Sequence, residues 1–105
     1  MSIGKTDRQS GTGVRERMAF KRPRLYRVLL HNDDYTTMEF VVAVLTGVFG
    51  KSDAEAVHIM LTVHHKGMGV AGVYTREVAE TKIEQVHEFA KSGQHPLRCS
   101  MEPER

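Results

Sequence analysis

The sequence has few of the features that mark membrane, secreted or disulfide-linked proteins. A single cysteine, Cys99, among 105 residues cannot form an internal disulfide, which indicates a reducing compartment. No apolar run approaches the roughly 20 residues that cross a membrane, and residues 1–20 lack the apolar core of a secretory signal. The length suits one domain with one modest core. We therefore expect a single-domain cytoplasmic protein without a membrane partner.

The net charge of +2 hides an asymmetry between the two parts of the chain. Residues 1–22 hold six basic groups and two acids, whereas residues 23–105 hold nine basic groups and eleven acids. A basic arm could bind nucleic acid, but the body offers no basic face to continue such a footprint. The composition therefore predicts a disordered basic extension over residues 1–22, a folded domain over residues 23–105 and no nucleic-acid partner.

The folded part is expected to begin with a short strand and a helix. Residues 26–30 form a β-rich run that ends at the turn signal Asn32–Asp34. Thr36 and Glu39 have the spacing of a capping box, and apolar residues then recur at helical spacing. Gly50 is expected to end this helix in the left-handed conformation.

A second helix is expected to follow directly. Ser52 and Glu55 repeat the capping-box spacing, and Gly67 ends the pattern. The side of this helix that packs in the core is predicted from its apolar residues, which are Ala56, Val57, Met60, Leu61 and Val63.

The last third of the chain adds two strands and one helix. Residues 68–74 fit a strand with a bulge or a close backbone approach at its glycines. Thr75 can cap a third helix that Gly93 ends, and residues 97–101 fit a closing strand. The order β-α-α-β-α-β predicts a compact α+β domain, a three-stranded antiparallel sheet packed against three helices.

Catalytic chemistry finds little support in this sequence. The six histidines lack the i, i+4 spacing of a helical zinc site, and only one thiol could assist them. Cys99 lies in an apolar strand, where a lone cysteine is usually a small buried hydrophobe. Asp33 and Asp34 fit turn chemistry better than an acid–base pair. We expect no enzyme activity, no metal and no cofactor.

A binding site is better supported. If the first two helices pack as an antiparallel pair, apolar side chains line a groove with polar groups at its rim. Such a groove suits a ligand with a cationic head and an apolar body. Residue patterns alone leave a second interpretation open, in which the methionines fill core gaps and the histidine is structural. The groove residues would be Met38, Val41, Met60 and Val63, and the rim residues Asn32, Asp34 and His64.

Several separated motifs resemble the ClpS family of Clp protease adaptors, over about residues 23–102. The resemblance implies binding of proteins whose first residue is Phe, Tyr, Trp or Leu, and their delivery to the ClpA unfoldase of the ClpAP protease. The matching segments are residues 26–36 (YRVLLHNDDYT), 38–41, 60–61 with 63–64, 72–75, 77–82 and 95–97 with Cys99.

The resemblance also implies a role for individual residues. Asn32, Asp34 and His64 would hold the α-amino group, and residues 1–22 would take part in delivery. Glu77 and Lys82 would face the unfoldase. The side-chain pocket would be lined by Thr36, Met38, Val41, Met60, Val63 and Leu97, with Asp33 nearby.

Two positions depart from the family pattern, and one alternative function stays open. Thr37 stands where the family usually has proline, and Ala71 replaces a Cys or a larger aliphatic residue. The alternative is a general protein–protein interaction module without N-terminus recognition, because the predicted fold also resembles the C-terminal domain of the ribosomal stalk protein.

Overall fold

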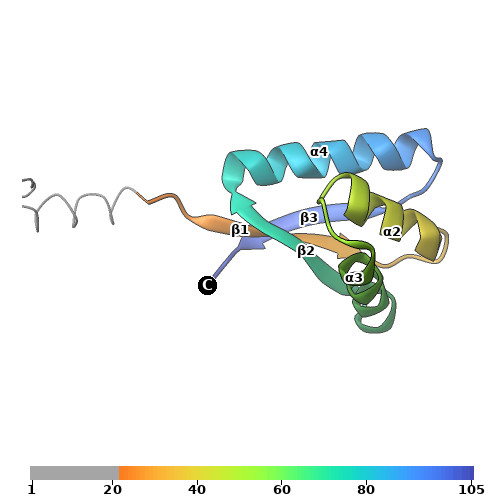
Figure 1. Ribbon diagram of the computed structural model, residues 1–105. Helices are drawn as coiled ribbons and strands as arrows, with labels where there is room; N and C mark the ends of the chain where they lie inside the picture. The colour runs from red at the N-terminus through yellow and green to blue at the C-terminus, as the bar shows by residue number, and fades with distance from the viewer. Residues whose placement is uncertain (1–21) are drawn as a thin grey trace, which may run out of the picture.

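The computed structural model describes residues 22–105, so the predicted extension lies outside the described residues except for Arg22. The element order is β-α-α-β-α-β, as predicted (Figure 1). The elements are β1 (Leu25–His31), α2 (Met38–Gly47), α3 (Asp53–Lys66), β2 (Met68–Thr75), α4 (Arg76–Ser92) and β3 (Arg98–Pro103).

The three strands form one antiparallel sheet with β1 in the centre and the order β2-β1-β3. The register between β1 and β2 shifts between Val28, which pairs with Gly72, and Leu29, which pairs with Val70. Ala71 is therefore an extra residue on β2, which confirms the predicted bulge.

The two faces of the sheet have different surroundings. Val28 and Leu30 are fully buried and belong to the main core cluster, together with Cys99 of β3. Arg27 and His31 alternate with these residues and so lie on the other face, where Arg27 pairs with Glu102 across β1 and β3. The core therefore lies on the side of the sheet that packs against the helices.

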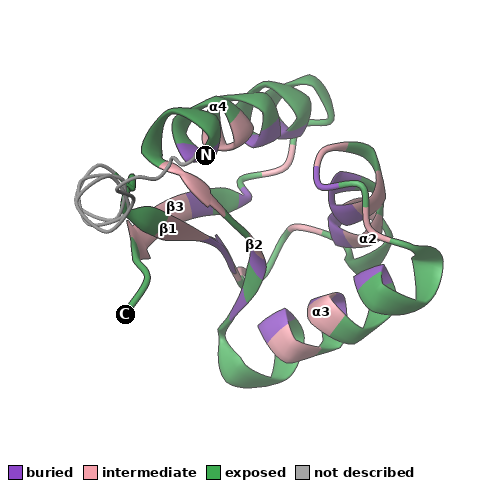
Figure 2. Ribbon diagram, turned by 60° about the vertical axis from the view of Figure 1, so that its left-hand side comes forward, coloured by how far each residue is buried: buried purple, intermediate pink, exposed green. Residues whose placement is uncertain are grey.

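One helix, α4, lies along the sheet, whereas α2 and α3 lie at one of its ends. α4 packs across all three strands, whereas α3 packs on β2 and α2 packs on α3 (Figures 1 and 2). Gly69 of β2 lies so close to α3 that an added Cβ would be 3.0 Å from Val63 Cγ2. This arrangement brings the turn after β1 next to the α2–α3 pair.

The start of α2 differs from the prediction by one residue. Thr37, not Thr36, is the N-cap, and its Oγ1 accepts from the Phe40 N–H at 3.1 Å. At the other end the regular helix stops at Gly47, but the turn continues to Gly50 at φ +64°. Lys51 N–H donates to the Leu45 carbonyl at 3.0 Å, so Gly50 does close the helix end in the left-handed conformation.

The other boundaries follow the sequence signals more closely. The predicted capping box of Ser52 and Glu55 opens α3, and Gly67 closes it at φ +93°. The predicted buried side of α3 was too broad, because Val57 is 41% and Leu61 is 40% exposed. Thr75 precedes α4 but makes no side-chain cap.

Within residues 22–105, no helix combines the length and the apolar character that a membrane crossing requires.

Candidate functional site

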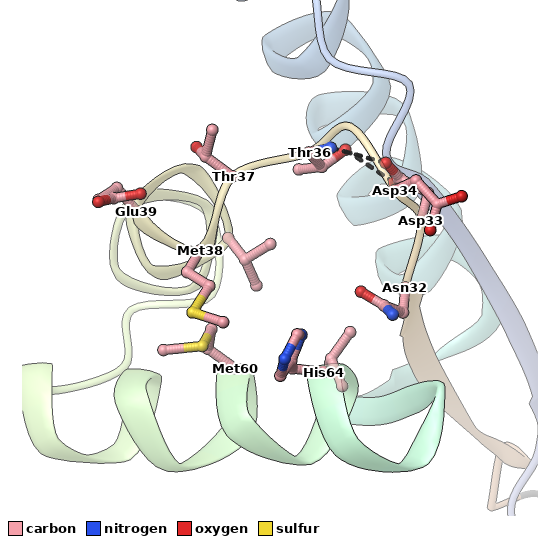
Figure 3. Close-up of a pocket in the computed structure, with 11 residues that line it drawn as sticks. Asn32, Asp33, Asp34, Thr36, Thr37, Met38, Glu39, Met60 and His64 are labelled. Atoms are coloured by element: carbon pink, nitrogen blue, oxygen red, sulfur yellow. Dashed lines mark hydrogen bonds between the residues drawn. The ribbon is translucent and has the colours of Figure 1, made fainter.

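A cavity of about 460 Å³ opens between the β1–α2 turn, the first turn of α2 and the inner side of α3 (Figure 3). Two segments far apart in sequence, residues 32–41 and residues 60–64, therefore contribute to one site, as the antiparallel packing of α2 and α3 was expected to do. The lining residues are Asn32, Asp33, Asp34, Thr36, Thr37, Met38, Glu39, Val41, Met60, Val63 and His64.

The polar rim consists of the three residues predicted to hold an amine. Asn32, Asp34 and His64 are exposed, and none of their side chains forms a hydrogen bond within residues 22–105. The side chains of Asn32 and His64 point into the space between the turn and α3 (Figure 3). The Asn32 N–H donates to the Gly67 carbonyl at 2.9 Å, which ties the turn to the end of α3. The backbone is thus fixed while the side-chain acceptors are left open.

Asp33 shapes the turn rather than the rim. Its Oδ1 accepts from the N–H groups of Tyr35 (2.8 Å) and Thr36 (2.6 Å), and its Oδ2 accepts from Thr36 Oγ1 at 2.7 Å. Burial alone would raise the pKa of the Asp33 carboxyl, but these hydrogen bonds and the charge of Arg98 outweigh it and lower the pKa. Asp33 is therefore ionised at neutral pH and holds the backbone between β1 and α2.

The inner part of the cavity is apolar and graded in exposure. Met38 is 43% exposed, whereas Val41, Met60 and Val63 are at most 9% exposed. The side chains of Met38 and Met60 approach each other from α2 and α3 (Figure 3). Unbranched thioether side chains adapt to the shape of a ligand. The cavity thus has a polar rim, a methionine at its mouth and a buried aliphatic base.

The expected and observed lining residues differ at three positions. Leu97 is 3% exposed and belongs to the core cluster, but it is not among the residues that line the cavity. Thr37 and Glu39 line the cavity although the sequence did not single them out as site residues. They occupy the N-cap and first turn of α2, and their side chains point away from the centre of the cavity (Figure 3). Their position next to Met38 in the sequence was the signal that could have identified them as cavity-lining residues.

The two residues predicted to face an unfoldase lie on α4, which contributes no side chain to the cavity. Glu77 is exposed and forms no ion pair within the described part of the chain. Lys82 is half-buried, and its Nζ donates to the Val48 carbonyl at 2.7 Å and lies 5.8 Å from the centre of the Tyr74 ring. Lys82 therefore joins α4 to the C-terminal end of α2.

The site offers groups for binding rather than for bond breaking. A carboxylate, an amide and an imidazole can accept the three protons of an ammonium group, and the apolar base can take a side chain attached beside it. Burial raises the pKa of the Cys99 thiol to about 12, so this cysteine is not an activated nucleophile. In the part of the chain that the structure describes, no cluster of three or more potential metal ligands is found.

Known proteins resemble this chain over nearly its whole length. A family model described as "ATP-dependent Clp protease adaptor protein ClpS" matches residues 21–100. The ATP-dependent Clp protease adapter protein ClpS of Desulfatibacillum aliphaticivorans is 69% identical over 80% of this chain and 81% of its own length. The protein of the same description from Maricaulis maris is 58% identical over 91% of this chain and 90% of its own length.

A solved structure gives the same result at the level of the fold. Agrobacterium tumefaciens ClpS2, bound to L-phenylalaninamide, matches with a TM-score of 0.76 and 43% identity. The match covers 79% of this chain and 100% of that one. With a family match that spans most of the chain and relatives well above half identical, this chain belongs to the ClpS family of adaptor proteins of the ATP-dependent Clp protease.

Proposed function

We propose that this adaptor binds proteins by their free N-terminus when the first residue is large and hydrophobic (Phe, Tyr, Trp or Leu), and delivers them to the ClpA unfoldase of the ClpAP protease. The observation that carries the proposal is the composition of one cavity, in which unpaired acceptors at the rim adjoin an apolar base lined by methionine and valine. The ligand of the related Agrobacterium protein, L-phenylalaninamide, supports it, because that molecule has a free α-amino group beside an aromatic side chain.

The rim is suited to a protonated α-amino group. Such a group has a pKa of about 7.7–8.0, so it is mostly cationic at neutral pH and has three N–H donors. Asp34 supplies a carboxylate, and the amide oxygen of Asn32 and a ring nitrogen of His64 supply two further acceptors. Hydrogen bonds between ionised groups are about twice as strong as neutral ones. An acetylated N-terminus loses both the charge and two donors, so it is expected to be rejected.

The base of the cavity selects the side chain next to that amine. Burying a Phe or Leu side chain stabilises a complex by roughly 1.5–3 kcal/mol. Met38 stands at the mouth, where it is 43% exposed and free to move aside for an unbranched β-carbon. A β-branched residue such as Val brings a methyl group toward Met38 at the point nearest the rim. A lysine side chain is cationic but has no bulky group beside its charge, so internal lysines are excluded.

The polar rim and the apolar base of the cavity are expected to act together. A micromolar dissociation constant corresponds to about −8 kcal/mol. Side-chain burial and a charge-assisted amine contact each supply only a fraction of this value, so the backbone of the second residue must also contribute. Neither a hydrophobic side chain alone nor an α-amino group alone is then sufficient for binding.

Delivery requires a second surface, and α4 provides one away from the cavity. Glu77 is exposed on its first turn, so a partner can reach it while a peptide occupies the cavity. For Lys82 we propose a mixed role, because its ammonium group also bonds the end of α2. The extension over residues 1–22, which lies almost entirely outside the described residues, would take part by engaging the unfoldase.

The test uses four fluorescently labelled peptides that differ only at their N-terminus: free Phe, free Leu, free Val and acetylated Phe. Anisotropy titrations with the full chain are expected to show tight binding of free Phe and Leu, and at least a tenfold loss on acetylation or with Val. Equal affinity for all four peptides, or no binding of any, would reject N-terminus recognition and favour the general interaction module.

A further inference from the structure

The solvent side of α4 combines acidic groups with exposed apolar side chains. Glu77, Glu84 and Glu88 recur at i, i+7 and i+11, which places them along one line of the helix. Val78 is 44% and Phe89 is 41% exposed beside this line. A groove of about 490 Å³ is lined by Glu84, Gln85, Glu88 and Phe89. We call the residues Glu77, Val78, Glu84, Gln85, Glu88 and Phe89 the outer face of α4.

The acids of the outer face are not neutralised within residues 22–105. Glu77, Glu84 and Glu88 form no ion pair there. The two cations of α4 closest in sequence to Glu77 have other partners, since Arg76 pairs with Glu80 at 3.3 Å and Lys82 donates to the Val48 carbonyl. The outer face therefore fits a segment that is basic and partly apolar.

The N-terminal end of the chain has this composition. Residues 14–22 read VRERMAFKR, with four basic residues and one acid. Val14, Met18 and Phe20 are interspersed with the charges. Both the sign of the charge and the mixture with apolar side chains thus complement the outer face of α4.

The place where this segment joins the fold also favours α4. Leu25, at the start of β1, pairs with Thr75, the residue that precedes α4. Nine extended residues span about 30 Å, and the 17 residues of α4 rise by about 26 Å, so the segment can follow the whole helix. The acids at the cavity rim lie at the opposite end of β1, about 23 Å away along seven strand residues.

We infer that residues 14–22 dock along the outer face of α4, with their basic side chains against Glu77, Glu84 and Glu88. Apolar side chains of the segment cover Val78 and Phe89, and an arginine can lie over the Phe89 ring. Exposed ion pairs are individually weak and are screened by salt, so the docked arm exchanges readily with a free one.

Docking has one consequence that rests on the proposed function. Glu77 belongs both to the outer face and to the proposed unfoldase surface, so the arm and the unfoldase compete for it. Binding of the unfoldase to α4 then frees the arm at the moment of delivery. Docking itself depends on neither peptide binding nor an unfoldase.

The experiment uses the full chain alone, with Ser10→Cys carrying a nitroxide spin label. Cys99 is buried and its thiol pKa is raised to about 12, so the label attaches at position 10. We expect several-fold stronger paramagnetic broadening for amide signals of Glu84, Gln85, Glu88 and Phe89 than for those of α3. The broadening should fall in about 0.5 M salt and in the double variant Glu84→Gln/Glu88→Gln.

The matched control, Glu39→Gln/Asp53→Asn, removes two exposed charges elsewhere and should leave the broadening on α4 unchanged. Three outcomes would overturn the inference: broadening spread evenly over the surface, broadening centred on the cavity rim, or broadening that disappears on dilution. The last would mean that the arm of a second copy is responsible. Normal affinity for a free Phe peptide alongside any of these results would leave the proposed function intact.

Discussion

In the turn after β1 and in helix α4, some charged side chains are bonded within the protein, whereas others have no partner within residues 22–105. In the turn, Asp33 accepts three hydrogen bonds, whereas the adjacent Asp34 accepts none from residues 22–105. On α4, Lys82 donates to the Val48 carbonyl, whereas Glu77 has no ion-pair partner in the same range. Asp33 and Lys82, which are bonded, fix backbone groups in place, whereas Asp34 and Glu77 are available to a ligand.

This comparison refines what family membership implies. Residues that recur together in a family motif can be divided by their partners in this fold into groups that build the site and groups that contact a ligand. Substitution of a building residue changes stability as well as binding, whereas substitution of a contact residue changes binding alone.

The largest effect is expected for Asp34→Asn. The substitution keeps the shape but removes the carboxylate that would pair with the α-amino group, which costs about 1.5–3 kcal/mol, or roughly 10- to 150-fold in affinity. Anisotropy with a free Phe peptide measures the loss, and thermal unfolding should show an unchanged midpoint. Glu39→Gln is the matched control, since Glu39 lines the cavity but points away from its centre. An equal loss in both variants would mean that only the overall negative potential matters.

Asp33→Ala is expected to act on the fold. Three hydrogen bonds to Tyr35 and Thr36 are lost, and the turn between β1 and α2 loosens. A destabilisation of about 2 kcal/mol is expected because two backbone N–H groups lose a charged partner. Urea unfolding measures it, and binding of the Phe peptide should weaken in parallel. Full stability with lost binding would instead assign Asp33 to direct contact with the ligand.

How far the sequence predicts this structure depends on whether a feature is local. The capping box of Ser52 and Glu55 and the left-handed glycine at residue 67 involve neighbours in the chain, and both were predicted correctly. The start of α2 was missed because Thr36 and Thr37 are equally good cap residues. Asp33 accepts from the hydroxyl and the N–H of Thr36, which leaves Thr37 to cap the helix. The spacing of Asp33 three residues before Thr36 was the sequence signal that Thr36 belongs to the turn and does not cap the helix.

Long-range features were less accessible. The apolar residues of α3 cover a broad side of the helix, and their pattern does not show that Val57 and Leu61 are less buried than Met60. Their burial depends on where α2 and β2 pack against α3. Leu97 was assigned to the pocket by resemblance, yet the cavity lining does not include it. The role of Lys82 at the end of α2 joins residues 34 positions apart, which no periodic pattern reveals.

Lys82→Met should have a smaller effect on the fold than Asp33→Ala. The variant keeps an unbranched side chain but removes the bond to the Val48 carbonyl, and α2 has no basic residue in its own last turn to replace it. We expect a loss of about 1 kcal/mol in the free energy of unfolding. Lys91→Met on the same helix is the control, because the Lys91 side chain makes no hydrogen bond or ion pair within residues 22–105. Equal stability of the two variants would mean that the Lys82 bond contributes nothing.

The smallest effect is the change in stability at acidic pH. It tests whether the turn is held by the negative charge of the Asp33 carboxylate or only by the shape of the side chain. The pKa of Asp33 is lowered from 3.8 in the folded protein, so the folded state binds a proton less readily than the unfolded chain. The stabilisation is therefore fully present above the unfolded pKa and is lost as the pH falls through the lowered, folded pKa. Asp33→Asn, which has no such charge, should be less stable than the wild type at pH 7, and this difference should shrink as the pH drops below about 4. Urea titrations of both proteins at a series of pH values measure it. A difference that stays constant down to the acid limit would show that the carboxylate charge plays no part, and that Asp33 and Asp34 differ only in where their side chains point.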